Sequence, residues 1–286
     1  MEKYNILKVG RDFDFVSNTT TTKGSRLKRI AIDKKTNEEI YFKYERYNCT
    51  ESCSEKISYE IARVLGYPCA HIEFGEDEKG KIGILNYLFI KREEEEHDDA
   101  KSYINRDSTE RKNFYTIQNI KNCLDKIDRS LFNDFLKIMV FDALVGETDR
   151  HEENWGIIKK NGKYKISPLY DNGCNLLREF KNEQLATQYY DEKKDFNSYI
   201  KRAKSVIYKD DHSRRYNLFE LIEYLYQRYP NQIKQEIDNL RKLTTEKIEE
   251  ITNKVPSKLL TEKHKMYIII YLKKRKEILE NIIKEK

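Results

Sequence analysis

The sequence lacks any long apolar run, and its start lacks an apolar segment. Nowhere in its 286 residues do the ~18 to 20 apolar residues that a membrane-spanning helix needs occur together. The first residues, Met1-Glu2-Lys3-Tyr4-Asn5, have no apolar region of the kind found in signal peptides. We therefore expect a cytoplasmic protein that does not associate with a membrane.

Apolar residues are few overall, and neither sign of charge dominates. Apolar residues make up 38% of the chain and charged residues 36%, which indicates a heavily charged surface. The 55 basic and 49 acidic residues leave a net charge of +6. This small excess suits an anionic ligand but falls short of a nucleic-acid-binding signature. Nucleic acid is therefore not the expected partner.

Cysteine is scarce and widely spaced. The five cysteines are an odd number in a chain without an export signal, which favours reduced thiols. Cys49 and Cys53 are close enough in sequence to share a metal ion, but no second cysteine pair or nearby histidine completes four ligands. We expect neither a disulfide framework nor a structural zinc site.

Residues 1–91 have the pattern of a β-rich lobe with one helix. Ser52 and Glu55 have the spacing of a capping box at the start of that helix, and Gly66 ends it. The predicted strands are 10–17, 29–32, 39–44, 70–74 and 81–89. The polar loop 18–28 offers backbone N–H groups and positive charge that could lie over phosphates. It contains one glycine and no G-x-G-x-x-G, so an ordinary hairpin connection remains an alternative.

Lys43 lies between two aromatic residues of a predicted strand, so its side chain points to the opposite face of the sheet. From that face its ammonium group could reach phosphate oxygens. The helix that follows carries Glu55 and Glu60, and either could pair with Lys43. Both could also face solvent, and the pattern of residues leaves these alternatives open.

Residues 92–286 have mainly helical patterns, so the predicted class is α+β with two lobes that meet at residue 91. The acidic run 93–99 is expected to be a solvated connection, and 172–214 a polar loop with some helix. A helix is predicted from Leu131 to Val145, with Ser130 as N-cap and Gly146 as its end. Further helices are predicted from residue 217 onward, and the last spans 266–283.

A hairpin in this half brings two polar side chains together. Asn161-Gly162 is a strong turn signal between the short strands 155–159 and 163–166. Asn154 directly precedes the first strand, and Asp171 follows the second. Because a tight antiparallel hairpin brings its outer ends together, we expect Asn154 and Asp171 to be neighbours.

Three chemistries compete for the stretch from Asp149 to Asp171. The zinc-protease motif H-E-x-x-H fails because Trp155 stands where the second histidine is needed, and no G-x-S-x-G nucleophile motif is present. Phosphoryl transfer remains. In that reaction Asp149 would accept the proton of the substrate hydroxyl, Asn154 and Asp171 would hold magnesium, and Lys43 would orient the phosphates.

The motif Thr148-Asp149-Arg150-His151-x-x-Asn154, followed by Ser167-Pro168-Leu169-Tyr170-Asp171, resembles T-D-x-H-x-x-N and P-x-Y-D of the HipA-like serine/threonine kinase family. The resemblance extends over residues 15–175 and includes Gly24-Ser25-Arg26-x-Lys28 in the phosphate loop. It implies a bilobal kinase-like fold, ATP and Mg²⁺ as cofactors, and Asp149 as catalytic base. It also implies that Asn154 and Asp171 bind the metal and that Lys43 binds ATP, assisted by Lys28, Gly24 and Ser25. Finally, it favours Glu55 over Glu60 as the partner of Lys43.

The leading hypothesis is therefore an ATP- and Mg²⁺-dependent kinase that acts on serine or threonine hydroxyls of proteins. The alternatives are a nucleotide-binding pseudokinase, a kinase-like enzyme acting on a small molecule or lipid, and a basic helical protein that binds nucleic acid. The chain has no room for the additional N-terminal subdomain of longer HipA proteins, so it resembles the compact CtkA-like members. An antitoxin-like partner is a weaker expectation. We also expect autophosphorylation within Ser17–Ser25, because family members can phosphorylate a serine of this loop.

Overall fold

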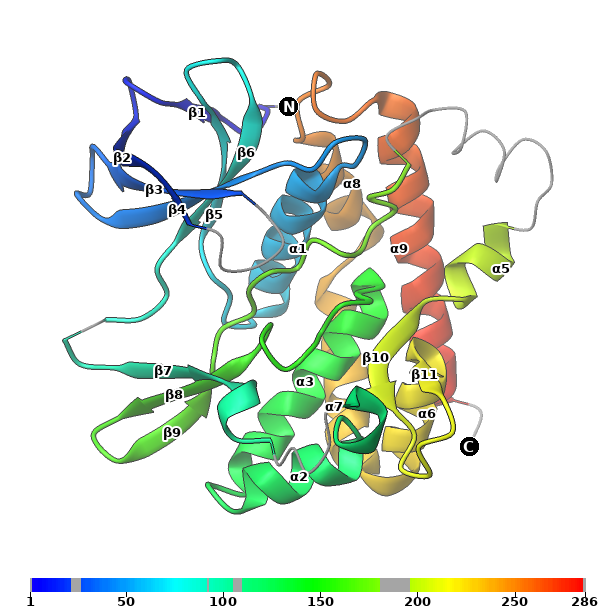
Figure 1. Ribbon diagram of the computed structural model, residues 1–286. Coiled ribbons are helices and arrows are strands. Elements are labelled where there is room, and N and C mark those ends of the chain that lie inside the picture. Colours follow the sequence, from blue (N-terminus) through cyan, green and yellow to red (C-terminus); the bar gives the residue numbers. More distant parts are fainter. Residues whose placement is uncertain (1, 22–26, 92, 105–109, 181–195, 285–286) are drawn as a thin grey trace.

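The computed structural model describes residues 2–21, 27–91, 93–104, 110–180 and 196–284, and only the backbone of 17–21. A six-stranded sheet in the order β1-β5-β6-β4-β3-β2 forms one end of the molecule (Figure 1). Its strands are β1 (Ile6–Lys8), β2 (Phe13–Thr21), β3 (Lys28–Asp33), β4 (Glu39–Tyr44), β5 (Ile72–Glu76) and β6 (Ile82–Tyr87). The five predicted strands are present. The structure adds β1, whose three residues are too few for a sequence pattern and which pairs with β5 in parallel.

The alternation of side chains along β4 explains where Lys43 points. Ile40 and Phe42 are buried in a small core with Phe13, Ala31 and Leu85. Successive side chains of a strand point to opposite faces, so Lys43 extends from the other face of the sheet. This face is covered by α1 (Glu51–Leu65), which packs against β5 and β6.

The predicted capping box at the start of α1 is wrong. The helix begins at Glu51, the N-cap residue Thr50 makes no side-chain capping bond, and Ser52 and Glu55 lie buried inside the helix. Tertiary contacts replace the local cap, because the Thr50 N–H donates to the Arg178 carbonyl at 2.8 Å. The end of the helix agrees with the prediction, since Gly66 adopts the left-handed conformation that favours glycine, with φ 73°.

A second sheet contains three strands in the order β7-β8-β9. They are β7 (Glu96–Asp99), β8 (Gly156–Lys160) and β9 (Lys163–Ile166). The acidic run was therefore wrongly predicted as a purely solvated connection, because its second half pairs with β8. Lysines of the hairpin face these acids, as in the pairs Lys165–Glu95 at 3.0 Å and Lys160–Glu94 at 2.5 Å. Across β7 and β8, Lys159 also lies opposite Glu96 at 3.5 Å, and opposite charges on neighbouring strands favour their pairing. The sequence around residue 95 does not contain this partner strand.

Helices fill the other end of the molecule, with α3 (Ser130–Val145) near its centre (Figure 1). The other helices are α2 (Ile117–Asp125), α5 (Phe196–Lys201), α6 (Leu218–Arg228), α7 (Pro230–Asn239), α8 (Thr245–Asn253) and α9 (Glu262–Ile282), with short 3-10 helices η1 (Ala100–Ser102), η2 (Arg111–Asn113) and η3 (Leu240–Lys242). A small hairpin of β10 (Lys204–Tyr208) and β11 (Arg215–Asn217) completes the fold. Across the described residues, none of the helices combines the length and apolarity needed to cross a membrane.

Three predictions for this half need correction. Ser130 is the first residue of α3 and not its N-cap, and its N–H donates to the Asp128 carboxylate at 2.8 Å. The segment 172–214, which was expected to be loop with some helix, contains the strand β10, which pairs with β11 directly after the segment. The last helix starts at Glu262, four residues before its predicted start, because the Thr261 side chain caps it by accepting the His264 N–H.

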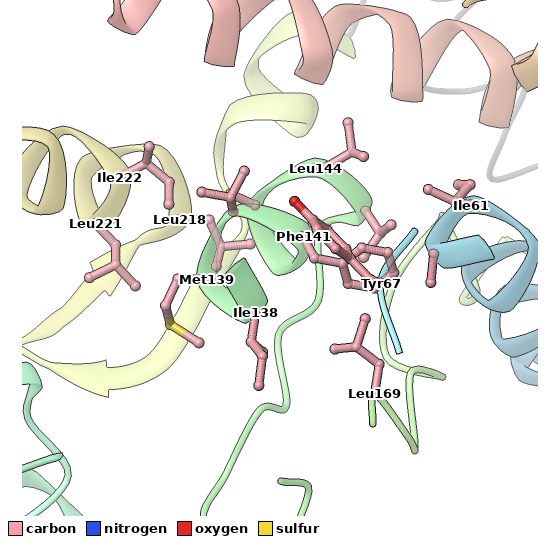
Figure 2. Close-up of a cluster of buried hydrophobic side chains, with 14 of the residues drawn as sticks. Ile61, Tyr67, Ile138, Met139, Phe141, Leu144, Leu169, Leu218, Leu221 and Ile222 are labelled. Atoms are coloured by element: carbon pink, nitrogen blue, oxygen red, sulfur yellow. The ribbon is translucent and has the colours of Figure 1, made fainter. Parts of the chain in front are cut away.

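The main core is continuous from α1 to the helices of the second half. Figure 2 shows Tyr67 beside Phe141 of α3, with Ile61 of α1 and Leu144 of α3 in the same cluster. The Tyr67 ring lies edge-on to Phe141, with ring centroids 6.2 Å apart, and the Tyr67 hydroxyl donates to Glu236 at 2.7 Å. The division into lobes 1–91 and 92–286 stays a prediction, and α1 is anchored to both.

Glu220 at the start of α6 allows a prediction for stability. Its carboxylate accepts hydrogen bonds from Arg214 at 2.7 and 2.8 Å and from the backbone of Asn217, the N-cap residue. The bonds from Arg214 lower the pKa of Glu220 from 4.5 to about 2, with a further contribution from Lys209. The ionised Glu220 carboxylate therefore contributes fully to the stability of the folded state above pH 4.5, and this contribution is lost as the pH falls toward 2.

We expect Glu220→Gln to lower the free energy of unfolding by about 1 to 2 kcal/mol at pH 7. Urea denaturation at pH 7, 5 and 3.5 should show this difference shrinking as the pH falls. Glu223→Gln, on the exposed side of the same helix, is the control and should change little at any of these pH values. A difference between wild type and Glu220→Gln that stayed constant with pH would contradict the assignment.

Candidate active site

The hairpin β8–β9 brings the predicted metal-binding residues to one place. Its turn residues Asn161 and Gly162 have φ of 49° and 74°, the left-handed values that a two-residue hairpin turn requires. At the open end of the hairpin, Nη1 of Arg150 donates to the carbonyl of Asn154 at 2.8 Å and to that of Tyr170 at 3.0 Å. One guanidinium group thus ties together Asn154, just before the hairpin, and Tyr170, the residue before Asp171.

Arg150 is held by a buried carboxylate of α3. Its guanidinium contacts both oxygens of Asp142 at 2.9–3.3 Å, and it also donates to the Asn172 side chain. Both charged side chains are 2% exposed. Burial raises the pKa of the Asp142 carboxyl and Arg150 opposes that effect, while the carboxylate keeps Arg150 protonated. Asp142 thus accepts hydrogen bonds from Arg150 in the core.

The backbone of Asp149 is fixed on both sides, while its carboxylate stays accessible. The Asp149 N–H donates to Glu147 at 2.9 Å, and its carbonyl accepts Nδ2 of Asn154 at 2.7 Å. The Asp149 side chain is 44% exposed. Glu147 is fully buried, and burial raises its pKa to about 8. It also accepts the N–H of Cys174 at 3.2 Å, so Glu147 links the segment of Asp149 to the chain that follows Asp171.

Lys43 reaches the site from the six-stranded sheet. Its Nζ lies 3.1 Å from Oδ1 of Asp171 and 4.0 Å from Oε2 of Glu55. Glu60 is instead engaged by Lys56 at 3.0 Å and by Arg63 at 3.2 Å, so of the two candidate acids only Glu55 lies beside Lys43. Asp171 has φ 54°, a left-handed backbone conformation that is costly for a residue other than glycine and that recurs at functional sites.

These residues line one cleft of about 950 Å³, a size suited to a small-molecule ligand. Of the predicted site residues, Lys28, Lys43, Asp149, Asn154 and Asp171 contribute to its lining, while buried Glu55 lies behind Lys43. The segment Asn86–Phe89 also lines it. Gly24 and Ser25 lie outside the described residues, so the structure provides no contact for them.

The side chains present fit a nucleotide and a magnesium ion. Lys28 and Lys43 supply positive charge, and Asn86 has a buried Nδ2 without a hydrogen-bond acceptor in the described chain, a donor suited to a base nitrogen. With Nδ2 of Asn154 engaged, the amide oxygen remains to bind a cation beside Asp171. No cluster of three or more acidic, histidine or cysteine side chains suited to a metal occurs in the part of the chain described. Magnesium commonly completes such a sparse set with phosphate oxygens and water.

Arg150 and Glu147 are the positioning residues that sequence reasoning missed. Both lie next to Asp149 in a short loop, where a charged residue is ordinarily assigned to the surface. The available signal was the buried helix position of Asp142, because a carboxylate there requires a cationic partner nearby. Tyr170 also helps to position the segment before Asp171, because its ring stacks on Phe89 with centroids 5.3 Å apart.

Comparison with solved structures defines the class of fold. The backbone is similar to that of the proinflammatory kinase CtkA of Helicobacter pylori, with a TM-score of 0.83 and 18% identity over 98% of each chain. It is also similar to the complex of HipA, HipB and operator DNA from the toxin–antitoxin system of Shewanella oneidensis MR-1. That match has a TM-score of 0.59 and 15% identity, and covers 93% of this chain and 66% of the other. The protein therefore has an α+β, kinase-like fold.

Within this class, the chain belongs to the HipA-like C-terminal domain family, whose model matches residues 19–255. A curated relative is the serine/threonine-protein kinase CtkA of Helicobacter pylori strain J99, 27% identical over 90 residues. That match spans 31% of this chain and 27% of the length of the relative. The resemblance drawn from the motifs around Asp149 and Asp171 is confirmed, and so is the similarity to CtkA-like members.

Proposed function

We propose that this protein transfers the γ-phosphate of Mg-ATP to serine or threonine hydroxyls of proteins. The observation that carries the proposal is the meeting of three side chains from separate elements. Lys43 and Asp171 line one cleft with 3.1 Å between Nζ of Lys43 and Asp171, and buried Glu55 lies behind Lys43 at 4.0 Å. A lysine on a strand paired with a glutamate on the next helix, beside a metal-binding aspartate, is the arrangement that kinases use. The curated CtkA relative, a serine/threonine-protein kinase, supports the choice of acceptor.

Each side chain has a defined task in this proposal. Lys43 and Lys28 bind phosphate oxygens, and Glu55 keeps Lys43 oriented toward them. Asn154 and Asp171 would hold the metal, which would neutralise the charge that develops on the transferred group. The Asp149 carboxylate orients the acceptor hydroxyl and takes its proton. Arg150 holds Asn154 and the residue before Asp171 in place, and Glu147 holds the backbone of Asp149.

Labelled ATP tests the proposal. Wild type, Asp171→Ala and the control Asp14→Ala should be incubated with Mg²⁺ and a cell lysate, and label should be measured on protein, lipid and small-molecule fractions. Asp14 is an exposed carboxylate on β2 and 60% accessible, so its removal leaves the cleft intact. We expect protein labelling by wild type and control, and none by Asp171→Ala.

Other outcomes favour the alternatives. Label on protein that persists in Asp171→Ala would contradict the site. Nucleotide binding without transfer would favour a pseudokinase, and transfer confined to lipids or metabolites would favour a small-molecule or lipid kinase. A stable, stoichiometric protein partner recovered with the chain from its native cell would support the antitoxin-like expectation, which is suggested by the HipA complex with HipB.

Autophosphorylation within Ser17–Ser25 is part of the same proposal. Residues 22–26 lie outside the described part of the chain, but Lys28 at the end of this loop lines the cleft. The serines and threonines of the loop are therefore close in sequence to Lys28, a residue of the proposed phosphate site. Mass spectrometry after incubation with Mg-ATP should find phosphate on this segment in wild type and not in Asp171→Ala. Unmodified peptides from wild type would rule it out.

A further inference from the structure

A second concavity lies beside the active-site cleft. It measures about 520 Å³ and is bordered by Thr148 and Cys174 on one side and by Lys204 and Arg215 of β10 and β11 on the other. Cys174 also lines the active-site cleft, and its Sγ lies 3.7 Å from Oδ2 of Asp149. The two concavities therefore share Cys174, which lies beside the Asp149 carboxylate. We call the second one the basic groove, after Arg178, Arg202, Lys204 and Arg215 in its lining.

The position of the basic groove suits a polypeptide that carries the acceptor hydroxyl. Lys28, Lys43 and Asn86–Phe89 line the active-site cleft toward the six-stranded sheet, where the nucleotide is proposed to bind. In the described chain, none of them borders the basic groove. The nucleotide would occupy the side of the cleft toward the sheet. A substrate whose serine or threonine hydroxyl reaches Asp149 from the other side would therefore place its neighbouring residues along the basic groove.

The charge of the basic groove is almost entirely positive. Its one acidic lining residue in the described chain is Glu179, which accepts a hydrogen bond from the Tyr199 hydroxyl. Arg178 is paired with buried Glu51. Lys204 and Arg215 are exposed, and no acidic partner for either occurs among the described residues.

Cations arranged in a concavity act together. Single exposed lysines contribute little to binding when they pair with an acid on an open surface. Charges of one sign along a groove add their potentials, and the protein walls focus the field onto whatever lies inside. Arg202, whose guanidinium lies 4.3 Å from the Tyr199 ring centroid, adds a third exposed positive charge to the two on the hairpin.

We propose that the basic groove binds acidic side chains next to the phosphorylated serine or threonine, so that the substrates are acidic protein segments. The proposal deepens the proposed function and rests on it for the acceptor role. It assigns substrate selection to Lys204 and Arg215, which lie outside the nucleotide cleft. Because both side chains are exposed and their hairpin is held by buried Val206 and Ile207, they can be changed without disturbing the core.

Binding and transfer should be measured on the same samples. The probes are fluorescein-labelled peptides with one central serine, flanked by glutamate, glutamine or lysine on both sides. Fluorescence anisotropy, with wild type and Lys204→Glu/Arg215→Glu, reports binding without any need for catalysis. We expect the glutamate peptide to bind best, roughly tenfold weaker binding in the double variant, and weakening with added salt. The lysine peptide should bind the double variant better than wild type.

The matched control is Lys242→Glu/Lys273→Glu, which changes the net charge equally through exposed lysines outside the basic groove. It should bind the glutamate peptide as wild type does. Equal affinity of wild type for the glutamate and glutamine peptides, or equal losses in the two double variants, would overturn the inference. Transfer of labelled phosphate to the bound peptide tests the proposed kinase function separately. A glutamate peptide that binds in the basic groove but accepts no phosphate would contradict the kinase function and leave the binding role of the groove standing.

Discussion

Replacement of Asp149 by asparagine is expected to reduce the rate of phosphate transfer by about 10²- to 10⁴-fold and to leave nucleotide binding unchanged. The change removes the carboxylate that we propose as the proton acceptor and keeps the size of the side chain. The backbone around it stays fixed, because the N–H of Asp149 is held by Glu147 at 2.9 Å and its carbonyl by Asn154 at 2.7 Å. The lost rate therefore measures the chemical role of the carboxylate rather than a rearranged loop.

The measurement is single-turnover transfer from labelled ATP, together with nucleotide affinity by calorimetry. The control is Asp14→Asn, which should transfer phosphate at the wild-type rate. Asp14 is an exposed carboxylate on β2 that pairs with Lys34 at 3.1 Å. Unchanged circular dichroism would establish that both variants are folded. Transfer by Asp149→Asn at the wild-type rate would remove Asp149 from the mechanism, whereas loss of nucleotide binding would indicate a structural role.

Loss of Arg150 is expected to have the largest effect on stability. Arg150→Met leaves Asp142 charged and unpaired inside α3, and removal of one partner of a buried ion pair costs about 3 to 5 kcal/mol. Urea denaturation should show this as a lower midpoint. The control is Arg63→Met, which should lower the free energy of unfolding by at most about 1 kcal/mol. The Arg63 side chain is 60% exposed and pairs with Glu60 at 3.2 Å.

A double variant separates stability from positioning. Arg150→Met/Asp142→Leu replaces both charges with apolar side chains and should recover most of the lost stability, because no buried charge is then left unpaired. Its transfer rate should stay low. The guanidinium that joins the Asn154 and Tyr170 carbonyls, at 2.8 and 3.0 Å, is still missing in this variant. Full recovery of both stability and transfer would show that Arg150 acts only in the core.

Local patterns predicted the elements around the site well, because their physics is local. Asn161-Gly162 supplies two residues that accept positive φ, so the hairpin and the approach of Asp171 to Asn154 follow from sequence. Gly146 ends α3 for a related reason, with φ 77°. The strand position of Lys43 between two aromatics likewise predicted the face from which it points.

Predictions failed where a distant partner replaced a local one. Ser52 and Glu55 have capping-box spacing, yet the backbone of Arg178 satisfies the start of α1 and Glu55 turns toward Lys43. The strand β7 forms in an acidic run only because β8 and the lysines of its hairpin lie alongside. No window of sequence around either segment contains the residues that decide its structure.

The sequence by itself determined the chemistry available to this protein: the carboxylates, amide and lysine of the proposed phosphate-transfer site, and the turn that brings two of them together. Only the tertiary structure decided which of Glu55 and Glu60 lies beside Lys43, and that buried Arg150 ties the Asp171 segment to Asn154. It also decided that Lys204 and Arg215, far from Asp149 in sequence, border a groove that reaches Cys174 beside the Asp149 carboxylate. The reason is physical. Turns and periodic faces depend on neighbours in the chain, whereas ion pairs and grooves depend on distances that only packing sets.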